Sequence, residues 1–187
     1  MRRASTRVAR DSIVAVEIRP AQAADALGVA TVHVRSWQAA YKGLLPDLYL
    51  DQLDVERRRA GWARNIDEAD WPRTGTLVAT EASGNVVGFA HVGPARDDDV
   101  DPLVVGELAA IYALPDVWGS GVGRRLMAAA VNVLRDAAFV DAILWVLEGN
   151  DRAQRFYEIG GWQLDGAAKD VVIADMPLAE VRYRLVL

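Results

Sequence analysis

Three glycines at alternate positions form the segment of the sequence with the clearest chemical signature. Gly119, Gly121 and Gly123 follow an apolar run and a Leu-Pro-Asp break, and they precede apolar residues at helical spacing. The pattern indicates a strand, a glycine turn and a helix. Such a turn leaves backbone N–H groups open at a helix start, where the helix dipole also favours negative charge. The turn therefore predicts a phosphate site, and Arg124 and Arg125 beside it could pair with further phosphate charge.

The glycine spacing narrows the kind of phosphate ligand. A dinucleotide fingerprint needs G-x-G-x-x-G, but its third glycine is replaced by Arg124 when counted from Gly119 and by Leu126 when counted from Gly121. A nucleotide-triphosphate loop needs a longer spacing and a following lysine, and the segment has neither. A short pyrophosphate cradle remains. The alternative is a tight turn in which the glycines serve the geometry alone.

A second segment, residues 141–164, reads as a buried strand and a short helix from about Asn150 to Ile159. With this segment the chain resembles the GCN5-related N-acetyltransferase (GNAT) superfamily, whose motifs are Q/R-x-x-G-x-G/A and N-x-x-A-x-x-F-Y-x-x-x-G-[F/W]. The first motif departs at Trp118, where Gln or Arg is usual. The likeness extends over roughly residues 14–187. The second motif is matched at Asn150, Ala153, Phe156, Tyr157, Gly161 and Trp162.

The resemblance implies an α/β fold with a mixed sheet of about seven strands and helices on both faces. In the family the sheet is splayed at its centre, and the pantetheine arm of acetyl-CoA pairs with the free edge like an added strand. Carried onto this chain, that edge is the main chain around Ile111, Tyr112 and Ala113. The remaining cosubstrate-binding residues implied by the two motifs are Trp118, Gly119, Ser120, Gly121, Val122, Gly123, Arg124, Asn150 and Phe156.

The activity implied is transfer of an acetyl group from acetyl-CoA to a primary amine of a small molecule or peptide, by direct attack in a ternary complex. Tyr157 resembles the family tyrosine that faces the CoA sulfur and can donate a proton to it; the alternative is a packed aromatic residue. Glu107 is the candidate base, because strand alternation places it on one face with Ala109 and Ile111. The alternatives are an ordinary ion pair of Glu107 on the opposite face, His91 as the base, or proton transfer to water.

The acceptor amine is expected at the first helix and the neighbouring strand. Trp37 and Tyr41 could bind it through stacking and cation–π contacts, with His91 nearby; the alternative is that both aromatic residues only anchor the helix to the sheet. A non-catalytic acyl-CoA-binding module is the alternative function. An oxidoreductase is excluded by the glycine spacing.

Composition agrees with one enzyme domain. The 187 residues suit a single domain at 14–187 after an N-terminal tail, residues 1–13, that we expect to be disordered. The absence of cysteine and the two isolated histidines argue against a metal site, and the net charge of −5 argues against nucleic acid as a partner. No segment has the roughly 20 apolar residues of a membrane span, so we expect a cytoplasmic protein with no membrane partner. The sequence does not decide between a monomer and a homodimer.

Periodicity and turn residues predict the order of the elements. Val14 to Arg19 is a first strand, a helix runs from Ala21 to about Lys42, and a second helix runs from Pro46 to about Ile66. A hairpin over 76–92 and a strand from Val104 then lead to the glycine turn. After its helix come a strand at 143–147, the helix at Asn150, and final strands near Trp162 and over 181–187.

Overall fold

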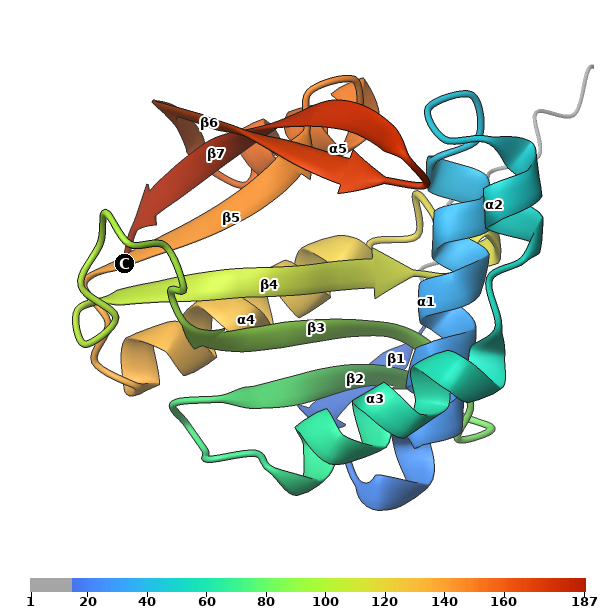
Figure 1. The fold of residues 1–187 in the computed structure, drawn as a ribbon. Helices are drawn as coiled ribbons and strands as arrows, with labels where there is room; N and C mark the ends of the chain where they lie inside the picture. Colours follow the sequence, from blue (N-terminus) through green and yellow to red (C-terminus); the bar gives the residue numbers. More distant parts are fainter. Residues whose placement is uncertain (1–14) are drawn as a thin grey trace, which may run out of the picture.

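The structure is a computed structural model that describes residues 15–187, so the predicted tail at 1–13 lies outside the described residues. Seven strands form one sheet in the order β1-β2-β3-β4-β5-β7-β6, with antiparallel pairs throughout except for the parallel pair β4–β5 (Figure 1). The predicted mixed α/β sheet of seven strands is confirmed. The strands are β1 (Val16–Pro20), β2 (Gly75–Glu81), β3 (Val86–Pro94), β4 (Val105–Ala113), β5 (Asp141–Leu147), β6 (Gln163–Ile173) and β7 (Met176–Val186).

Helices cover both faces of the sheet, as the resemblance implied. In Figure 1, α1 (Ala26–Ala40) and α3 (Val55–Asp67) lie in front of the sheet and α4 (Val122–Asp136) lies behind it. The front layer packs Val29 and Trp62 against Phe89, whereas the rear layer packs Leu126 and Leu134 into the larger core cluster. Burial at i, i+4 spacing along α4 explains why this segment is helical. None of the helices in residues 15–187 is long and apolar enough to cross a membrane.

The single helix predicted from Pro46 to Ile66 is wrong. The segment forms two helices, α2 (Asp47–Asp51) and α3, separated by a break before Asp54. The Asp54 side chain accepts a hydrogen bond from the Arg57 amide at 2.7 Å and thereby caps the start of α3. An aspartate in this position satisfies an otherwise unpaired helix-terminal N–H, which favours a new helix start over a continuous helix.

The sheet opens between β4 and β5. These strands pair only from Val105 to Glu107 on β4, although β4 continues to Ala113 and β5 continues past its last pair, Ile143, to Leu147. An extra residue in β4 at Ala109 accompanies the opening, because His91 pairs with Ala110 while Val92 pairs with Leu108. The two strands therefore part at the centre of the sheet and leave main-chain edges without a strand partner.

The bulge at Ala109 corrects the predicted alternation along β4. Leu108 and Ile111 both pack into the core cluster beneath α4, whereas Ala110 and Tyr112 pack against the cluster beneath α1. Glu107, which precedes Leu108, is thus on the α1 face and does not share a face with Ile111. One inserted residue shifts the register, and the carboxylate belongs to the face that carries the aromatic residues of α1.

Candidate active site

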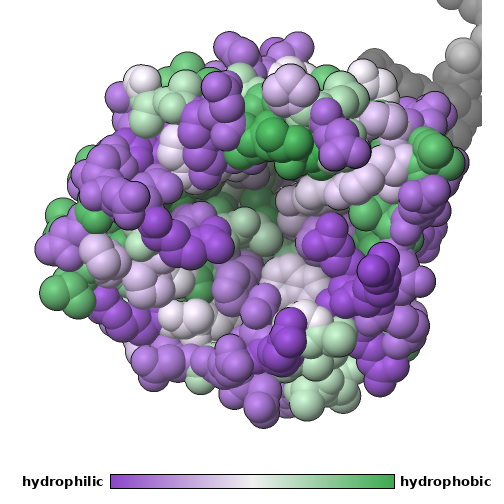
Figure 2. Space-filling view, viewed as in Figure 1, coloured by the Kyte–Doolittle hydropathy of each residue, from purple (hydrophilic) through white to green (hydrophobic). Residues whose placement is uncertain are grey.

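A cleft of about 650 Å³ follows the opening between β4 and β5. Figure 2 shows the hollow in the middle of the face that Figure 1 presents, with polar residues around much of its rim. The volume falls within the range of small-molecule and cofactor sites. Most of the predicted site residues line it: Trp37, Tyr41, Glu107, Ile111, Tyr112, Ala113, Trp118, Gly119, Gly121, Gly123, Arg124, Asn150, Phe156 and Tyr157.

The glycine turn forms one end of the cleft. Gly119 and Gly121 have φ angles of 80° and 92°, in the left-handed region that favours glycine. Gly121 is the N-cap of α4 and supplies no side-chain cap, so the first-turn N–H groups of this helix face the turn without an internal side-chain acceptor. A Cβ atom built on Gly119 would meet nothing within 4 Å. The turn is therefore an open cradle at a helix N-terminus, which suits an anionic ligand.

Two residues of the predicted cradle offer only their main chain. The Ser120 hydroxyl donates to the Val117 carbonyl at 2.6 Å, and the Val122 side chain is 1% exposed in the core. The Ala113 carbonyl, predicted as part of the edge that pairs with a ligand, already accepts two hydrogen bonds. The donors are the Trp118 indole at 2.7 Å and the Ser36 hydroxyl at 2.9 Å. That carbonyl is not open to a ligand, which is a correction to the predicted edge.

Tyr157 lies in the cleft on α5 (Asp151–Ile159). The helix begins at Asn150, whose side-chain oxygen accepts from the Ala153 amide at 3.2 Å and caps the first turn. The Tyr157 ring packs edge-on against Phe156, with ring centroids 5.5 Å apart. Burial raises the pKa of the Tyr157 hydroxyl above its usual range, so the hydroxyl stays protonated and remains a proton donor.

Glu107 lies at the edge of the opening with its side chain 8% exposed. The Arg96 guanidinium donates to both of its carboxylate oxygens, at 2.8 and 2.9 Å. This pair fixes the carboxylate geometrically and raises the pKa of Arg96. Glu107 therefore lines the cleft and forms the ion pair that was the alternative to its role as base, and the role of base stays a prediction.

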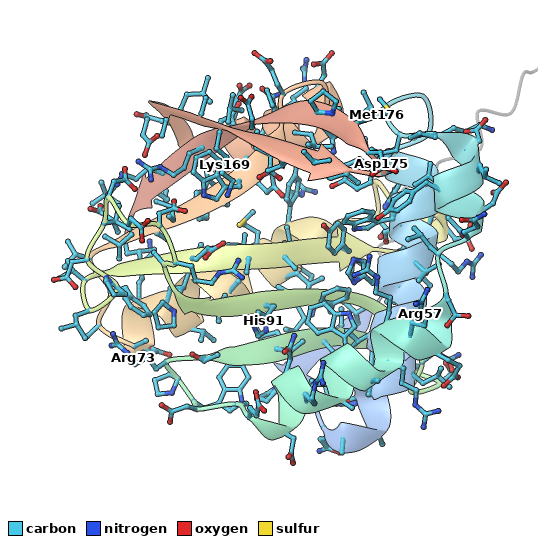
Figure 3. All side chains as sticks on the ribbon, in the orientation of Figure 1. Arg57, Arg73, His91, Lys169, Asp175 and Met176 are labelled. Carbon is cyan, nitrogen blue, oxygen red and sulfur yellow. The ribbon has the colours of Figure 1, made fainter. Side chains whose placement is uncertain are left out.

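His91 is not among the residues that line the cleft. Its Nδ1 atom lies 2.9 Å from the Thr76 hydroxyl, and its ring packs edge-on against Trp62. Burial and the nearby Arg96 lower the pKa of His91, which keeps the ring neutral. Figure 3 labels His91 on β3, away from Lys169 at the opposite rim. The His91 side chain lies in the layer beneath α3, outside the cleft lining, and its substrate role stays a prediction.

Trp37 and Tyr41 form the wall of the cleft on the α1 side. Their rings meet edge-on with centroids 4.9 Å apart. Burial raises the pKa of the Tyr41 hydroxyl, and the same cause raises that of Tyr112. Both hydroxyls therefore stay uncharged. An aromatic wall with neutral hydroxyl groups suits an apolar or cationic group of a ligand.

Comparison with known proteins decides the family. Residues 37–161 match the model of the acetyltransferase (GNAT) family. The chain belongs to this family. It is 34% identical to a Bacillus subtilis protein described as an uncharacterized N-acetyltransferase, YuaI, over 72% of this chain and 73% of that one. The resemblance that the two sequence motifs indicated is thereby confirmed, and so is the assignment to an acetyltransferase family.

Solved structures show the same fold. The PaiA N-acetyltransferase of Thermoplasma acidophilum, in complex with coenzyme A, aligns with a TM-score of 0.70 at 17% identity over 92% of this chain and 99% of that one. The YncA protein of Salmonella typhimurium, with its cofactor acetyl-CoA, aligns with a TM-score of 0.68 at 21% identity over 92% and 94% of the two chains. At these identities the match supports the GNAT fold alone.

The position that departs from the GNAT motif has a defined role. Trp118 carries the Arg152 guanidinium on its ring, 3.5 Å from the ring centroid. Arg152 also lines the cleft, so the aromatic residue positions a cation beside the glycine turn. Arg152 was not predicted as a site residue, although it lies two residues after Asn150. Four further lining residues were not predicted either, because they come from different strands and loops and share no local spacing: Arg96, Trp145, Lys169 and Glu180.

Proposed function

We propose that this GNAT protein transfers the acetyl group of acetyl-CoA to a primary amine of a small molecule or peptide, by direct attack in a ternary complex. The observation that carries the proposal is the cleft along the β4–β5 opening, which joins the glycine turn to Tyr157 and Glu107. A single continuous site can then hold both reactants. The chain contains no cysteine, so a thiol of the protein cannot carry the acetyl group between them.

The residues present fit acetyl-CoA. The left-handed Gly119 and Gly121 open the N-terminus of α4 toward a pyrophosphate, and Arg124 and Arg152 add positive charge at the same end of the cleft. A ligand that lies along the opening would meet main-chain groups of β4 near Ile111 that no strand covers. Acetyl-CoA combines both features, because it has a charged pyrophosphate and an extended amide-bearing arm.

Tyr157 serves as the proton donor in this proposal. When the amine nitrogen bonds to the acetyl carbon and the carbon–sulfur bond breaks, the departing thiolate needs a proton. Desolvation in the cleft raises the pKa of the Tyr157 hydroxyl, which therefore keeps its proton at neutral pH and can give it to the sulfur. The packing of its ring against Phe156 sets the direction of the hydroxyl.

Glu107 serves as the proton acceptor. The amine must lose a proton to attack, and Glu107 is the carboxylate nearest to the point at which β4 and β5 part. Arg96 donates one hydrogen bond to each carboxylate oxygen, which leaves a second lone pair on each oxygen to take the amine proton directly or through a water. His91 lies outside the cleft lining, so of the three predicted proton acceptors the structure favours Glu107 or water.

An acceptor screen tests the proposal. The protein is incubated with acetyl-CoA and a panel of polyamines, aminoglycosides, amino acids and peptides with free N-termini, and thiol release is followed together with product mass. We expect thiol release that depends on particular amines and a product heavier by one acetyl group. Tight acetyl-CoA binding without release by any amine would instead favour an acyl-CoA-binding module.

A further inference from the structure

The part of the cleft bordered by β5, β6 and β7 contains a tryptophan whose ring already carries an ammonium group. Lys169, on β6, places its Nζ atom 3.9 Å from the centroid of the Trp145 ring on β5. The same Nζ lies 3.5 Å from a carboxylate oxygen of Glu180 on β7. All three residues line the cleft. An aromatic face next to a carboxylate is the arrangement by which proteins bind organic cations.

Trp145 borders the part of the opening next to Glu107, where the proposed function places the acceptor amine. Strand alternation places it on the face of β5 shared with Ile143, which pairs with Glu107 in the last β4–β5 pair. Because β4 leaves β5 after this pair, Trp145 borders the gap just beyond Glu107. A cation on the Trp145 ring and an amine at Glu107 would therefore lie along one path in the cleft.

A network of hydrogen bonds and ion pairs holds the Trp145 ring in place. Its indole N–H donates to the Asp97 carboxylate, at 2.9 Å to the nearer oxygen. Asp97 also accepts from Arg182 at 3.0 Å, and Arg182 lies opposite Trp145 on β7. The Arg182 side chain is 7% exposed and also pairs with Asp99 and Asp165. The Asp97 and Asp99 carboxylates on this guanidinium anchor the loop between β3 and β4, and with it the acceptor of the indole hydrogen bond.

The Lys169 side chain, by contrast, can move away from the Trp145 ring. This side chain is 41% exposed, and within residues 15–187 it forms an ion pair with Glu180 alone. Figure 3 shows Lys169 where β6 and β7 pass over β5, at the rim of the cleft. A long flexible side chain at a rim can move into solvent, whereas Trp145 and its anchor cannot move without breaking several buried contacts. Two other cations lie near this site and both have carboxylate partners: Arg182, 5.5 Å from the centroid of the Trp145 ring, pairs with Asp97, Asp99 and Asp165, and Arg96 pairs with Glu107.

We propose that Trp145 and Glu180 form a cation subsite for the acceptor, which Lys169 occupies until an acceptor with a second ammonium group displaces it. Asp97 and Arg182 are positioning residues that hold the ring. The inference deepens the proposed function and rests on it for the acceptor role of this part of the cleft. The substrate class is thus an aliphatic amine with an additional cationic group, one end at Glu107 and the other on Trp145.

Matched ligands test the subsite without turnover. Cadaverine and pentylamine have the same carbon chain and differ only in the second amine. Their affinities are measured by isothermal titration calorimetry with protein saturated with CoA, which carries no acetyl group to transfer. We expect cadaverine to bind at least about fivefold more tightly than pentylamine. Equal affinities would overturn the subsite, and because no transfer is measured, that result would leave acetyl transfer to other amines intact.

Variants assign the residues. Lys169→Ala should strengthen cadaverine binding about fivefold and leave pentylamine binding unchanged, whereas Lys42→Ala, which removes the other lysine of the chain, should change neither. Trp145→Leu should abolish the preference for cadaverine. Asp97→Ala should reduce this preference while pentylamine and CoA binding persist, an outcome that general destabilisation would not give. A preference that survives Trp145→Leu, or cadaverine binding that weakens in Lys169→Ala, would overturn the proposal.

Discussion

The proposed reaction depends at the residue scale on a tyrosine that keeps its proton. Tyr157 is half-buried, with its ring packed against Phe156, and desolvation raises the pKa of its hydroxyl. Tyr183 is a second tyrosine and is buried, but its hydroxyl lies within hydrogen-bond distance of Gln154 and Glu158, and it does not line the cleft. Substitutions of these two tyrosines can therefore distinguish the effect of losing a proton donor in the cleft from the effect of losing a hydroxyl in the core.

Tyr157→Phe should lower kcat by roughly ten- to a thousandfold, because the ring stays but the proton donor is lost. The dissociation constant of acetyl-CoA should be unchanged. Tyr183→Phe is the matched control, and it should lower stability by about 1 kcal/mol with little effect on kcat. Steady-state kinetics and calorimetry measure both variants. Equal turnover in Tyr157→Phe and wild type would reduce Tyr157 to a packing residue.

The glycine turn gives a test of the pyrophosphate cradle. Gly121 is a poor site for substitution because its φ of 92° would strain any side chain, whereas Gly123 has no positive φ and its added Cβ would meet Phe156 at 3.4 Å, an ordinary contact. Gly123→Ala should therefore fold normally while its methyl group enters the cleft. We expect acetyl-CoA affinity to fall about tenfold, or about 1.4 kcal/mol.

Gly61→Ala is the control for this substitution, because Gly61 is a helical glycine on α3 with open space around it. It should raise stability by up to about 1 kcal/mol and leave acetyl-CoA affinity unchanged. Unaltered affinity in a folded Gly123→Ala protein would remove the cradle assignment.

Local motifs made much of the site predictable. The geometry of the glycine turn and of the segment from Asn150 to Tyr157 is determined by residues close together in the sequence. The face of Glu107 was not predictable in this way, because the bulge at Ala109 is a property of the pairing with β3. The Arg96 and Trp145 contacts likewise join segments far apart in the chain.

At the element scale, the hairpin of β6 and β7 ends in a turn built from unfavourable residues. Ala174 and Asp175 have φ angles of 53° and 59°, although neither is glycine. Two-residue hairpin turns of this kind favour Asn followed by Gly, because a side chain in the left-handed region costs roughly 1 kcal/mol. Figure 3 labels Asp175 at the tip of the hairpin, beside the end of α1.

The double substitution Ala174→Asn and Asp175→Gly should raise the free energy of unfolding by about 1 kcal/mol. Gly84→Ala in the β2–β3 turn tests the same physics with the opposite sign, because Gly84 has a φ of 88° and its added Cβ would meet nothing within 4 Å. That variant should lose about 1 kcal/mol. Urea denaturation compares both with wild type, and a destabilised hairpin variant would contradict the assigned turn.

The sequence predicted the order of the elements better than their ends. Alternation and turn residues located every strand, but β6 and β7 run for 11 residues each and are longer than the segments expected near Trp162 and at 181–187. Their exposed residues give a weak hydrophobic pattern, so the length of this hairpin follows from mutual pairing. The break before α3 depended on the Asp54 cap, which periodicity alone does not reveal.

At the scale of the whole molecule, the lowered pKa values of the two histidines predict how the free energy of unfolding depends on pH. Burial and Arg58 lower the pKa of His33 to about 4, and burial also lowers that of His91. The Trp62 indole donates to His33 Nδ1 at 3.0 Å, which requires the neutral ring. The unfolded chain takes up these protons below about pH 6.5, whereas the folded protein does not. Stability from the neutral rings is thus present above pH 6.5 and lost as the pH falls toward 4.

Urea denaturation at pH 7 and pH 5 should show this loss. His33 should contribute a decrease of about 2 kcal/mol in the free energy of unfolding between these values. His33→Gln keeps a hydrogen-bond acceptor for Trp62 but does not titrate, so its decrease should be smaller by a similar amount. A variant with the same pH dependence as wild type would show that His33 does not stay neutral in the folded state.

Initial rates with both reactants varied test the central claim most directly. The claim is that one cleft binds acetyl-CoA and the amine together, with Tyr157 and Glu107 on either side of the reacting atoms. Rates are measured over a range of acetyl-CoA concentrations at several fixed amine concentrations. We expect reciprocal plots that intersect, as a ternary complex requires, and no acetylated protein before the amine is added. Parallel lines with an isolable acetyl-enzyme would contradict the account.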